Sequence, residues 1–188
     1  MQHFGVFLHI TVEDVAGGNK MSGDNLIKRA VQGDKEAFAK LYSQYKDRLY
    51  RYAYFKLGND SDAQDAVADC IVCAYQSIGT LKNEKAFDAW IFKILYRSCC
   101  ALVKRQIENK GVESLDSHKN SASYEPCFAS AELSEALSLL DSTDRDIVLL
   151  SAVAGFNSRE IGRLTGQNPN TVRSRLSRSL AKMKAFLR

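Results

Sequence analysis

Residues 157–176 read NSREIGRLTGQNPNTVRSRL, a pattern typical of two short helices joined by a tight turn. Asn157 can cap the first helix, and Glu160 follows it at the spacing of a capping box. Gly166 can adopt the left-handed conformation that ends a helix, and Pro169 suits the first position of the next helix. Together these signals predict a helix-turn-helix.

The second helix of this motif combines an apolar stripe with a polar and basic outer side. Val172, Leu176 and Leu180 recur every four residues, and we expect them to face the core. A helix of this kind suits the major groove of DNA. Its candidate DNA-binding residues are Asn168, Asn170, Thr171, Arg173, Ser174, Arg175 and Arg178.

The charge of the chain is distributed unevenly. Residues 155–188 contain eight Lys or Arg and a single acid, for a net charge of +7, whereas residues 106–146 have a net charge of −6. A solvated helix with incidental cations is the alternative interpretation of the basic end. Because the caps, the turn, the apolar stripe and the charge agree, we interpret this end as binding nucleic-acid phosphates.

The composition favours helices. The chain has 188 residues, 45% of them hydrophobic, and only two prolines. Apolar residues recur at spacings of three and four along residues 24–105, and no strand pattern follows residue 20. We therefore predict an all-α fold of two small helical domains joined by a flexible linker, with the helix-turn-helix in the second domain.

The expected domain order has four parts. Residues 1–20 form a mobile N-terminal extension, residues 21–105 a first helical domain, residues 106–129 an acidic flexible linker, and residues 130–188 the helix-turn-helix domain. The extension lacks the basic start of a signal peptide, and no apolar run is long enough to cross a membrane. We expect a cytoplasmic protein without membrane insertion, whose five cysteines stay reduced.

The helix predicted to begin at Ser61, with Gln64 completing a capping box, carries acids on its outward side. This acidic stripe could dock a basic protein partner. It could equally be a solvated helix start, where carboxylates complement the helix dipole. The residue pattern favours neither interpretation. The stripe comprises Asp62, Asp65, Asp69, Val72 and Gln76.

The next helix and the loop before it carry cations beside aromatic residues. Such a surface suits single-stranded DNA, whose bases can stack on rings or be flipped into a pocket. The alternative is that Phe87 and Trp90 belong to the core, and the regular apolar spacing favours this for Trp90. The candidate residues are Lys82, Asn83, Phe87, Trp90, Lys93, Arg97, Lys104 and Arg105.

The chain lacks the sequence marks of an enzyme or a cofactor site. Cys70 and Cys73 form a C-x-x-C, but they lie within a predicted helix and no histidine is near them in sequence, so we expect no metal or cofactor. We find no phosphate loop and no pairing of a nucleophile with a base. A helical enzyme with a DNA-binding tail and an ordinary helix-turn-helix repressor nevertheless stay open as alternatives.

Several stretches in order resemble a bacterial RNA polymerase sigma factor of the extracytoplasmic-function subfamily. The resemblance covers about residues 24–187. Three positions depart from the common pattern: Asp141 replaces a usual proline, Gly162 a common alanine, and Arg97 a frequent asparagine. The matching stretches are residues 49–53 (LYRYA), 58–67 (GNDSDAQDAV), 87–94 (FDAWIFKI), 139–145 and the helix-turn-helix.

The resemblance implies partners and a division of roles. It implies that the acidic stripe docks on the clamp helices of the largest subunit of core RNA polymerase, and that the flap of the second largest subunit is a further contact. The loop and helix around Trp90 would hold the melted minus-10 element, and the recognition helix would bind the minus-35 element of promoter DNA. The chain would promote melting for transcription initiation without catalysis of its own, and an anti-sigma factor would restrain it.

Overall fold

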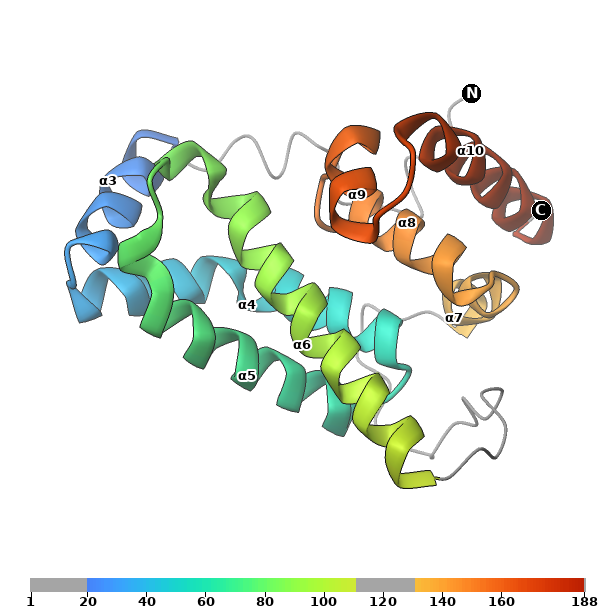
Figure 1. Ribbon diagram of the computed structural model, residues 1–188, viewed down its shortest axis with the longest axis horizontal. Helices are drawn as coiled ribbons and strands as arrows, with labels where there is room; N and C mark the ends of the chain where they lie inside the picture. Colours follow the sequence, from blue (N-terminus) through green and yellow to red (C-terminus); the bar gives the residue numbers. More distant parts are fainter. Residues whose placement is uncertain (1–19, 111–130, 188) are drawn as a thin grey trace.

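The computed structural model describes residues 20–110 and 131–187, and every regular element in these ranges is a helix (Figure 1). This confirms the predicted all-α fold. The N-terminal group comprises α3 (Lys20–Val31), α4 (Lys35–Leu57), α5 (Asp60–Ser77), the short 3-10 turns η1 (Ile78–Thr80) and η2 (Glu84–Ala86), and α6 (Phe87–Lys110). The C-terminal group comprises α7 (Ala131–Ser138), α8 (Ser142–Ala152), α9 (Ser158–Thr165) and α10 (Pro169–Phe186).

The predicted extension and linker lie mostly outside the described residues. The helix predicted to end at residue 105 continues to Lys110. Gln106 donates from Nε2 to the carboxylate of Asp62 at 2.6 Å, and Lys104 pairs with Glu108 one turn later. The Lys104–Glu108 pair spans one turn of α6 and favours helical geometry, while the Gln106 hydrogen bond fixes α6 to α5 in the first residues of the stretch that we expected to be linker.

Side-chain caps define the ends of α4 and α5. Asp34 accepts the backbone N–H of Ala37 at 3.0 Å and begins α4, and Gly58 ends it in the left-handed conformation. Asn59 then accepts the N–H of Asp62 at 2.8 Å. The predicted cap at Ser61 is therefore wrong. Asn59, directly after Gly58, has the extended conformation and caps the helix, so the cap lies two residues earlier than predicted.

The core of the first domain lies where α4 packs against both α5 and α6. Most of the apolar positions spaced three and four apart are buried, but Tyr75, whose spacing along α5 predicts an inward position, is 46% exposed and packs edge to face with Phe38. Phe87 is 1% exposed and packs between Tyr45 and Trp90. The fully buried large side chains here include Leu41, Leu49, Tyr52, Ile91, Phe92 and Leu95.

The second domain packs α10 across α8 and α9. The buried face of α8, from Ile147 to Leu150, supplies much of its core. Arg145 closes the end of α7 by donating from Nε to the carbonyl of Leu137 at 3.1 Å and from Nη2 to that of Leu140 at 3.3 Å. Burial lowers the pKa of Arg145, and the two carbonyls accept two of its five donors.

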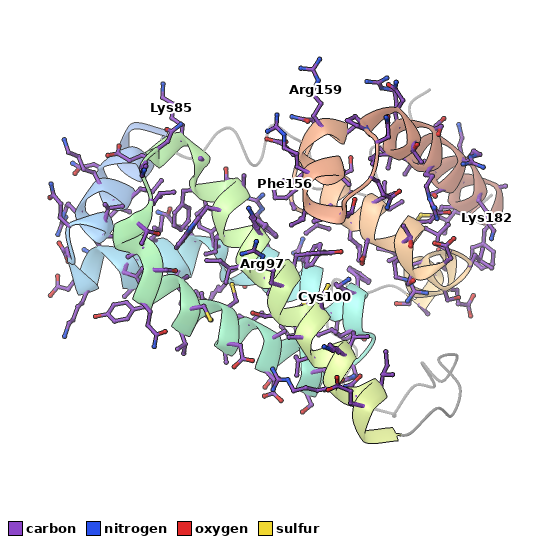
Figure 2. All side chains as sticks on the ribbon, in the orientation of Figure 1. Lys85, Arg97, Cys100, Phe156, Arg159 and Lys182 are labelled. Atoms are coloured by element: carbon purple, nitrogen blue, oxygen red, sulfur yellow. The ribbon has the colours of Figure 1, made fainter. Side chains whose placement is uncertain are left out.

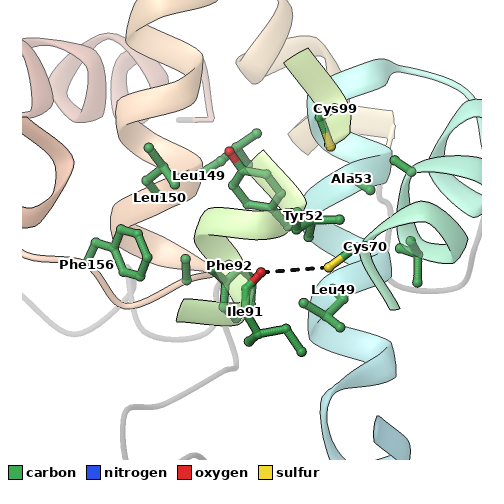
Figure 3. Packing of buried hydrophobic residues seen from close by; sticks show 14 of the residues in the cluster. Leu49, Tyr52, Ala53, Cys70, Ile91, Phe92, Cys99, Leu149, Leu150 and Phe156 are labelled. Atoms are coloured by element: carbon green, nitrogen blue, oxygen red, sulfur yellow. Dashed lines mark hydrogen bonds between the residues drawn. The ribbon is translucent and has the colours of Figure 1, made fainter. Parts of the chain in front are cut away.

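The two domains also pack against one another, through α4 and α8 (Figure 1). Figure 3 shows Leu149, Leu150 and Phe156 of the second domain beside Tyr52 and Phe92 of the first. The rings of Phe92 and Phe156 lie 6.4 Å apart, edge to face. The buried hydrophobic residues of both domains form one continuous cluster. The sequence patterns predicted two domains on a tether and did not predict this contact.

Candidate nucleic-acid and protein interfaces

The helix-turn-helix has the local geometry that its sequence predicts. Asn157 accepts the N–H of Glu160 at 3.1 Å, and the Glu160 carboxylate accepts the N–H of Asn157 at 2.8 Å, which completes the capping box. Gly166 ends α9 with a φ of 73°. Asn168 accepts the N–H of Asn170, and Pro169 is the first residue of α10. These caps set the angle between the two helices.

Gly162 allows the two helices of the motif to approach closely. A Cβ atom at this position would lie 2.6 Å from the backbone carbonyl oxygen of Gln167 and 3.5 Å from the ring of Pro169. The carbonyl of Gly162 accepts the N–H of Gln167 at 3.0 Å, so the turn is bound to the helix at this point. The departure from alanine noted in the sequence is therefore matched by a tight turn.

The outer side of α10 presents most of the residues expected to bind DNA. Val172 is fully buried, whereas Leu176 and Leu180, expected to face the core with it, are half-buried, and Ser179 and Met183 complete the buried side of the helix. Arg173 donates from Nη1 to the side-chain oxygen of Asn170 at 3.1 Å, and Arg178 donates to the carbonyl of Ser174. Both partners lie on the same exposed side. The exposed residues from the predicted set are Asn168, Asn170, Thr171, Arg173, Ser174 and Arg178.

Arg175 differs from the rest of the predicted set. Its Nε donates to Oδ1 of Asp144 at 2.5 Å, and its Nη2 donates to both oxygens of Asp141 at 3.1 and 3.2 Å. The hydrogen bond to Asp144 is the main cause that raises the pKa of Arg175. The side chain is 26% exposed. Arg175 therefore joins α10 to α8 in this structure.

Two cations outside the predicted set lie near the recognition helix. Arg159 and Arg163 are exposed on α9, and Figure 2 shows Arg159 extending away from the body of the domain. The net charge of residues 155–188 includes both residues, but the predicted DNA-binding set contains only residues of the second helix and its cap. Arginines beside a recognition helix can reach phosphates that flank the groove.

A second basic surface lies on η2 and α6 of the first domain. Asn83 caps η2 by accepting the N–H of Lys85 at 3.0 Å. Of the two aromatic residues expected here, Phe87 lies in the core and Trp90 is half-buried. Trp90 thus keeps an accessible part while packing on Phe87. Figure 2 labels two exposed cations of this surface, Arg97 and Lys85, the second of which lies outside the predicted set. The exposed members of the predicted set are Lys82, Asn83, Lys93, Arg97, Lys104 and Arg105.

The acidic stripe on α5 is partly paired by residues of α6. Asp69 pairs with Arg105 at 3.5 Å, and half-buried Asp62 accepts from Gln106. Asp65 and Gln76 are exposed. The stripe also contains Val72, which is 56% exposed, so an apolar side chain lies among the carboxylates. An acidic surface with an exposed apolar residue can bind a basic protein face.

The two cysteines of the C-x-x-C sequence, Cys70 and Cys73, are both free and lie in different surroundings. Cys70 is buried and its Sγ contacts the carbonyl of Ile91 at 3.8 Å, whereas Cys73 is exposed (Figure 3). Burial raises the pKa of Cys70 and of Cys99 to about 12. Within residues 20–110 and 131–187, no cluster of three or more metal-ligating side chains was found. No helix in these ranges is long and apolar enough to cross a membrane.

Two family descriptions match the chain: Sigma-70 region 2 matches residues 41–107, and Sigma-70, region 4 matches residues 130–183. RNA polymerase sigma factor SigV of Bacillus subtilis is 29% identical over 156 residues, which cover 83% of this chain and 94% of SigV. ECF RNA polymerase sigma factor BldN of Streptomyces coelicolor is 28% identical over 84% of this chain and 64% of BldN.

Among solved structures, the chain resembles the sigma factor RpoE in complex with the anti-sigma factor NepR from Bartonella quintana. The TM-score is 0.63 at 19% sequence identity, over 80% of this chain and 96% of RpoE. At this identity the likeness supports the fold of the described helices. The match extends across both helical domains.

Proposed function

Because the chain belongs to the sigma-70 family, in the extracytoplasmic-function subfamily that acts in promoter recognition and transcription initiation, we propose that it directs core RNA polymerase through three surfaces. The acidic stripe of α5 docks on the clamp helices of the largest polymerase subunit. The outer side of α10 binds the minus-35 element as duplex. The basic surface of η2 and α6 holds the melted minus-10 element, and the flap of the second largest subunit is a further contact.

The observation that carries the minus-35 assignment is the exposed, basic outer side of α10 behind a fully formed helix-turn-helix. Arg173 and Arg178 are exposed cations on this side, and Ser174 lies between them. Side chains of these types donate to base edges or to phosphates. Arg159 and Arg163 on α9 add positive charge beside the groove. A helix presented in this way suits the major groove.

Exposed cations around a half-buried tryptophan support the minus-10 assignment. Lys93 and Arg97 lie on the same helix as Trp90, and Lys82 lies in the loop before it. The cations can hold the backbone of a single strand while an unstacked base contacts the ring of Trp90. Capturing unstacked bases would offset part of the cost of melting. Phe87, predicted for the same role, supports Trp90 from the core.

Docking on polymerase is supported by the exposed carboxylate of Asp65 and by the apolar side chain of Val72 beside it. The polymerase performs the chemistry, so the chain acts without a catalytic residue of its own, and we place it in the cytoplasm with the polymerase. We also propose regulation by an anti-sigma factor. The complex of RpoE with NepR supports this because a similar fold binds such a partner.

Reconstitution with sigma-free core polymerase tests the proposal. Transcription of a fragmented genomic template should yield RNAs with defined start sites only when the chain is added. Tight binding to a palindromic duplex by the chain alone, without RNA synthesis, would favour a repressor instead. Chemical conversion of nucleic acid by the chain, without RNA synthesis, would favour the enzyme interpretation.

A pull-down with core polymerase tests the docking surface. Asp65→Lys should abolish co-purification, because a cation would face a basic partner and like charges at an interface cost several kcal/mol. Asp47→Lys is the matched control, since Asp47 is an exposed acid on α4 outside the stripe. Equal retention of both variants would contradict the assignment of α5.

A further inference from the structure

Two arginines on the recognition helix, two residues apart, have opposite surroundings. Arg173 is exposed, and its side-chain partner is Asn170 on the same helix. Arg175 turns toward its own domain, where its guanidinium binds Asp144 at 2.5 Å and Asp141 at 3.1 Å. The periodicity of the helix places both residues on its polar part. The contacts with α8 distinguish them.

The two carboxylates lie at the start of α8 and are positioned by contacts within that helix. Asp141 is the N-cap of α8 and accepts the N–H of Asp144 at 2.7 Å. Asp144 lies in the first turn of the same helix, where negative charge complements the helix dipole. A guanidinium fork suits two acceptors held in this way better than a flexible ammonium does. The contact thus ties the start of α8 to the middle of α10.

This pairing removes the unbalanced positive charge that a phosphate contact needs. Two carboxylates bind one guanidinium, so the charge of Arg175 is balanced within its own domain. The side chain of Asp141 is 61% exposed and would repel a phosphate that approached Arg175. A paired arginine releases no counterions from DNA, because its charge is already balanced. Arg173 and Arg178 carry no such pairing with an acid in the described residues.

We propose that Arg175 is a positioning residue for promoter recognition. By binding Asp144 and Asp141, it sets the rotation of α10 on α8 and so the angle at which Arg173, Ser174 and Arg178 meet the groove. The inference rests on the proposed function of α10 and assigns to Arg175 a role other than the DNA contact predicted for it. Asp141 and Asp144 thereby support recognition although, as acids, they do not bind phosphates themselves.

A charge swap in the holoenzyme separates the two roles. The probe is a labelled duplex that wild-type holoenzyme selects from a randomised pool. Arg175→Asp should lower affinity for it about tenfold, roughly the effect of one mismatched base pair. The double variant Arg175→Asp with Asp144→Arg should recover to within about threefold of wild type, because the pair is restored in reverse. If Arg175 instead touches DNA, the double variant stays as weak as the single one, and the proposal is overturned.

The salt dependence of binding provides a second, independent readout. Arg173→Ala should reduce the slope of log affinity against log salt by about 0.9, the value for one lost phosphate contact. Arg175→Ala should leave the slope within about 0.3 of wild type while lowering affinity at every salt concentration. A slope change for Arg175→Ala as large as that for Arg173→Ala would contradict the positioning role.

Unfolding without DNA separates failure of this inference from failure of the proposed function. Thermal unfolding of wild type, Arg175→Asp and the double variant, followed by circular dichroism, should show that the swap recovers the stability lost in Arg175→Asp. If wild-type holoenzyme selects no duplex, the proposed function of α10 fails whatever the swap does. If wild type selects a duplex and the swap restores stability without restoring recognition, the positioning role fails alone.

Discussion

The ion pair between the domains and the ion pair inside the second domain use similar groups in different surroundings. Lys56 of α4 donates to Asp146 of α8 at 2.5 Å, with side chains only 9% and 16% exposed. The Lys56 ammonium also lies 4.8 Å from the centre of the Tyr96 ring. Arg175 and Asp144 are 26% and 25% exposed. One pair is enclosed by aromatic side chains, and the other lies at the edge of the solvent.

The difference in exposure predicts how each ion pair responds when one of its charges is lost. A charge left alone in an enclosed site costs far more than one left near water, because water cannot solvate it. The contact between the domains should therefore be sensitive to the loss of either charge and tolerant of the loss of both. The contact behind the recognition helix should affect geometry more than stability.

Lys56→Met should have the largest effect. It leaves Asp146 unpaired in the domain interface, and we expect a loss of about 3 kcal/mol in the free energy of unfolding, measured with urea. The matched control is Lys56→Met with Asp146→Leu, which removes both charges and should recover most of that loss. Equal destabilisation by the single and double variants would break the comparison, because it would mean that the pair itself stabilises the interface.

Gly162→Ala should come next. The added methyl would overlap the carbonyl of Gln167, so we expect a loss of about 1–3 kcal/mol by overpacking. The control is Gly79→Ala, where a Cβ atom meets only one atom, at 3.9 Å. Thermal unfolding of both variants gives the measurement. An unchanged melting temperature for Gly162→Ala would show that the turn relaxes easily, and that Arg175 has a less rigid support than we infer.

Arg178→Ala should have a smaller effect, confined to DNA binding. Arg178 is exposed and bonded only to its own helix among the described residues, so its removal should lower promoter affinity about fivefold and leave unfolding unchanged. Binding of the holoenzyme to the selected duplex is the measurement. A loss of stability equal to that in Arg175→Ala would erase the contrast between exposed and paired arginines.

Cysteine alkylation should produce the smallest perturbation and test burial directly. Because burial raises the pKa of Cys70 and Cys99 to about 12, both thiols are protonated at neutral pH and should resist iodoacetamide. Exposed Cys73 should react before Cys70 and Cys99, as peptide mass spectrometry can show. Reaction of Cys99 as fast as Cys73 in the native protein would mean that the helices beside the domain interface open readily.

The sequence predicted the parts of the site that depend on near neighbours. The capping box at Asn157, the left-handed Gly166 and the inward Val172 are all set by residues within one or two turns. Such patterns are legible because helix geometry brings positions three and four apart together. The same logic predicted which side of α5 would be acidic. It misplaced the cap of α5, where Asn59 and Ser61 both had suitable side chains.

The sequence alone therefore predicts the class of fold, the helix-turn-helix and the basic and acidic surfaces. Tertiary packing, by contrast, brings Arg175 to Asp144, 31 residues away, and Lys56 to Asp146, 90 residues away. It also decided that Phe87 lies in the core while Trp90 keeps an accessible part. A residue's position in the helical repeat determines the side of the helix on which it lies, because the helix has a regular geometry. Its partner depends on which other helix packs against that side.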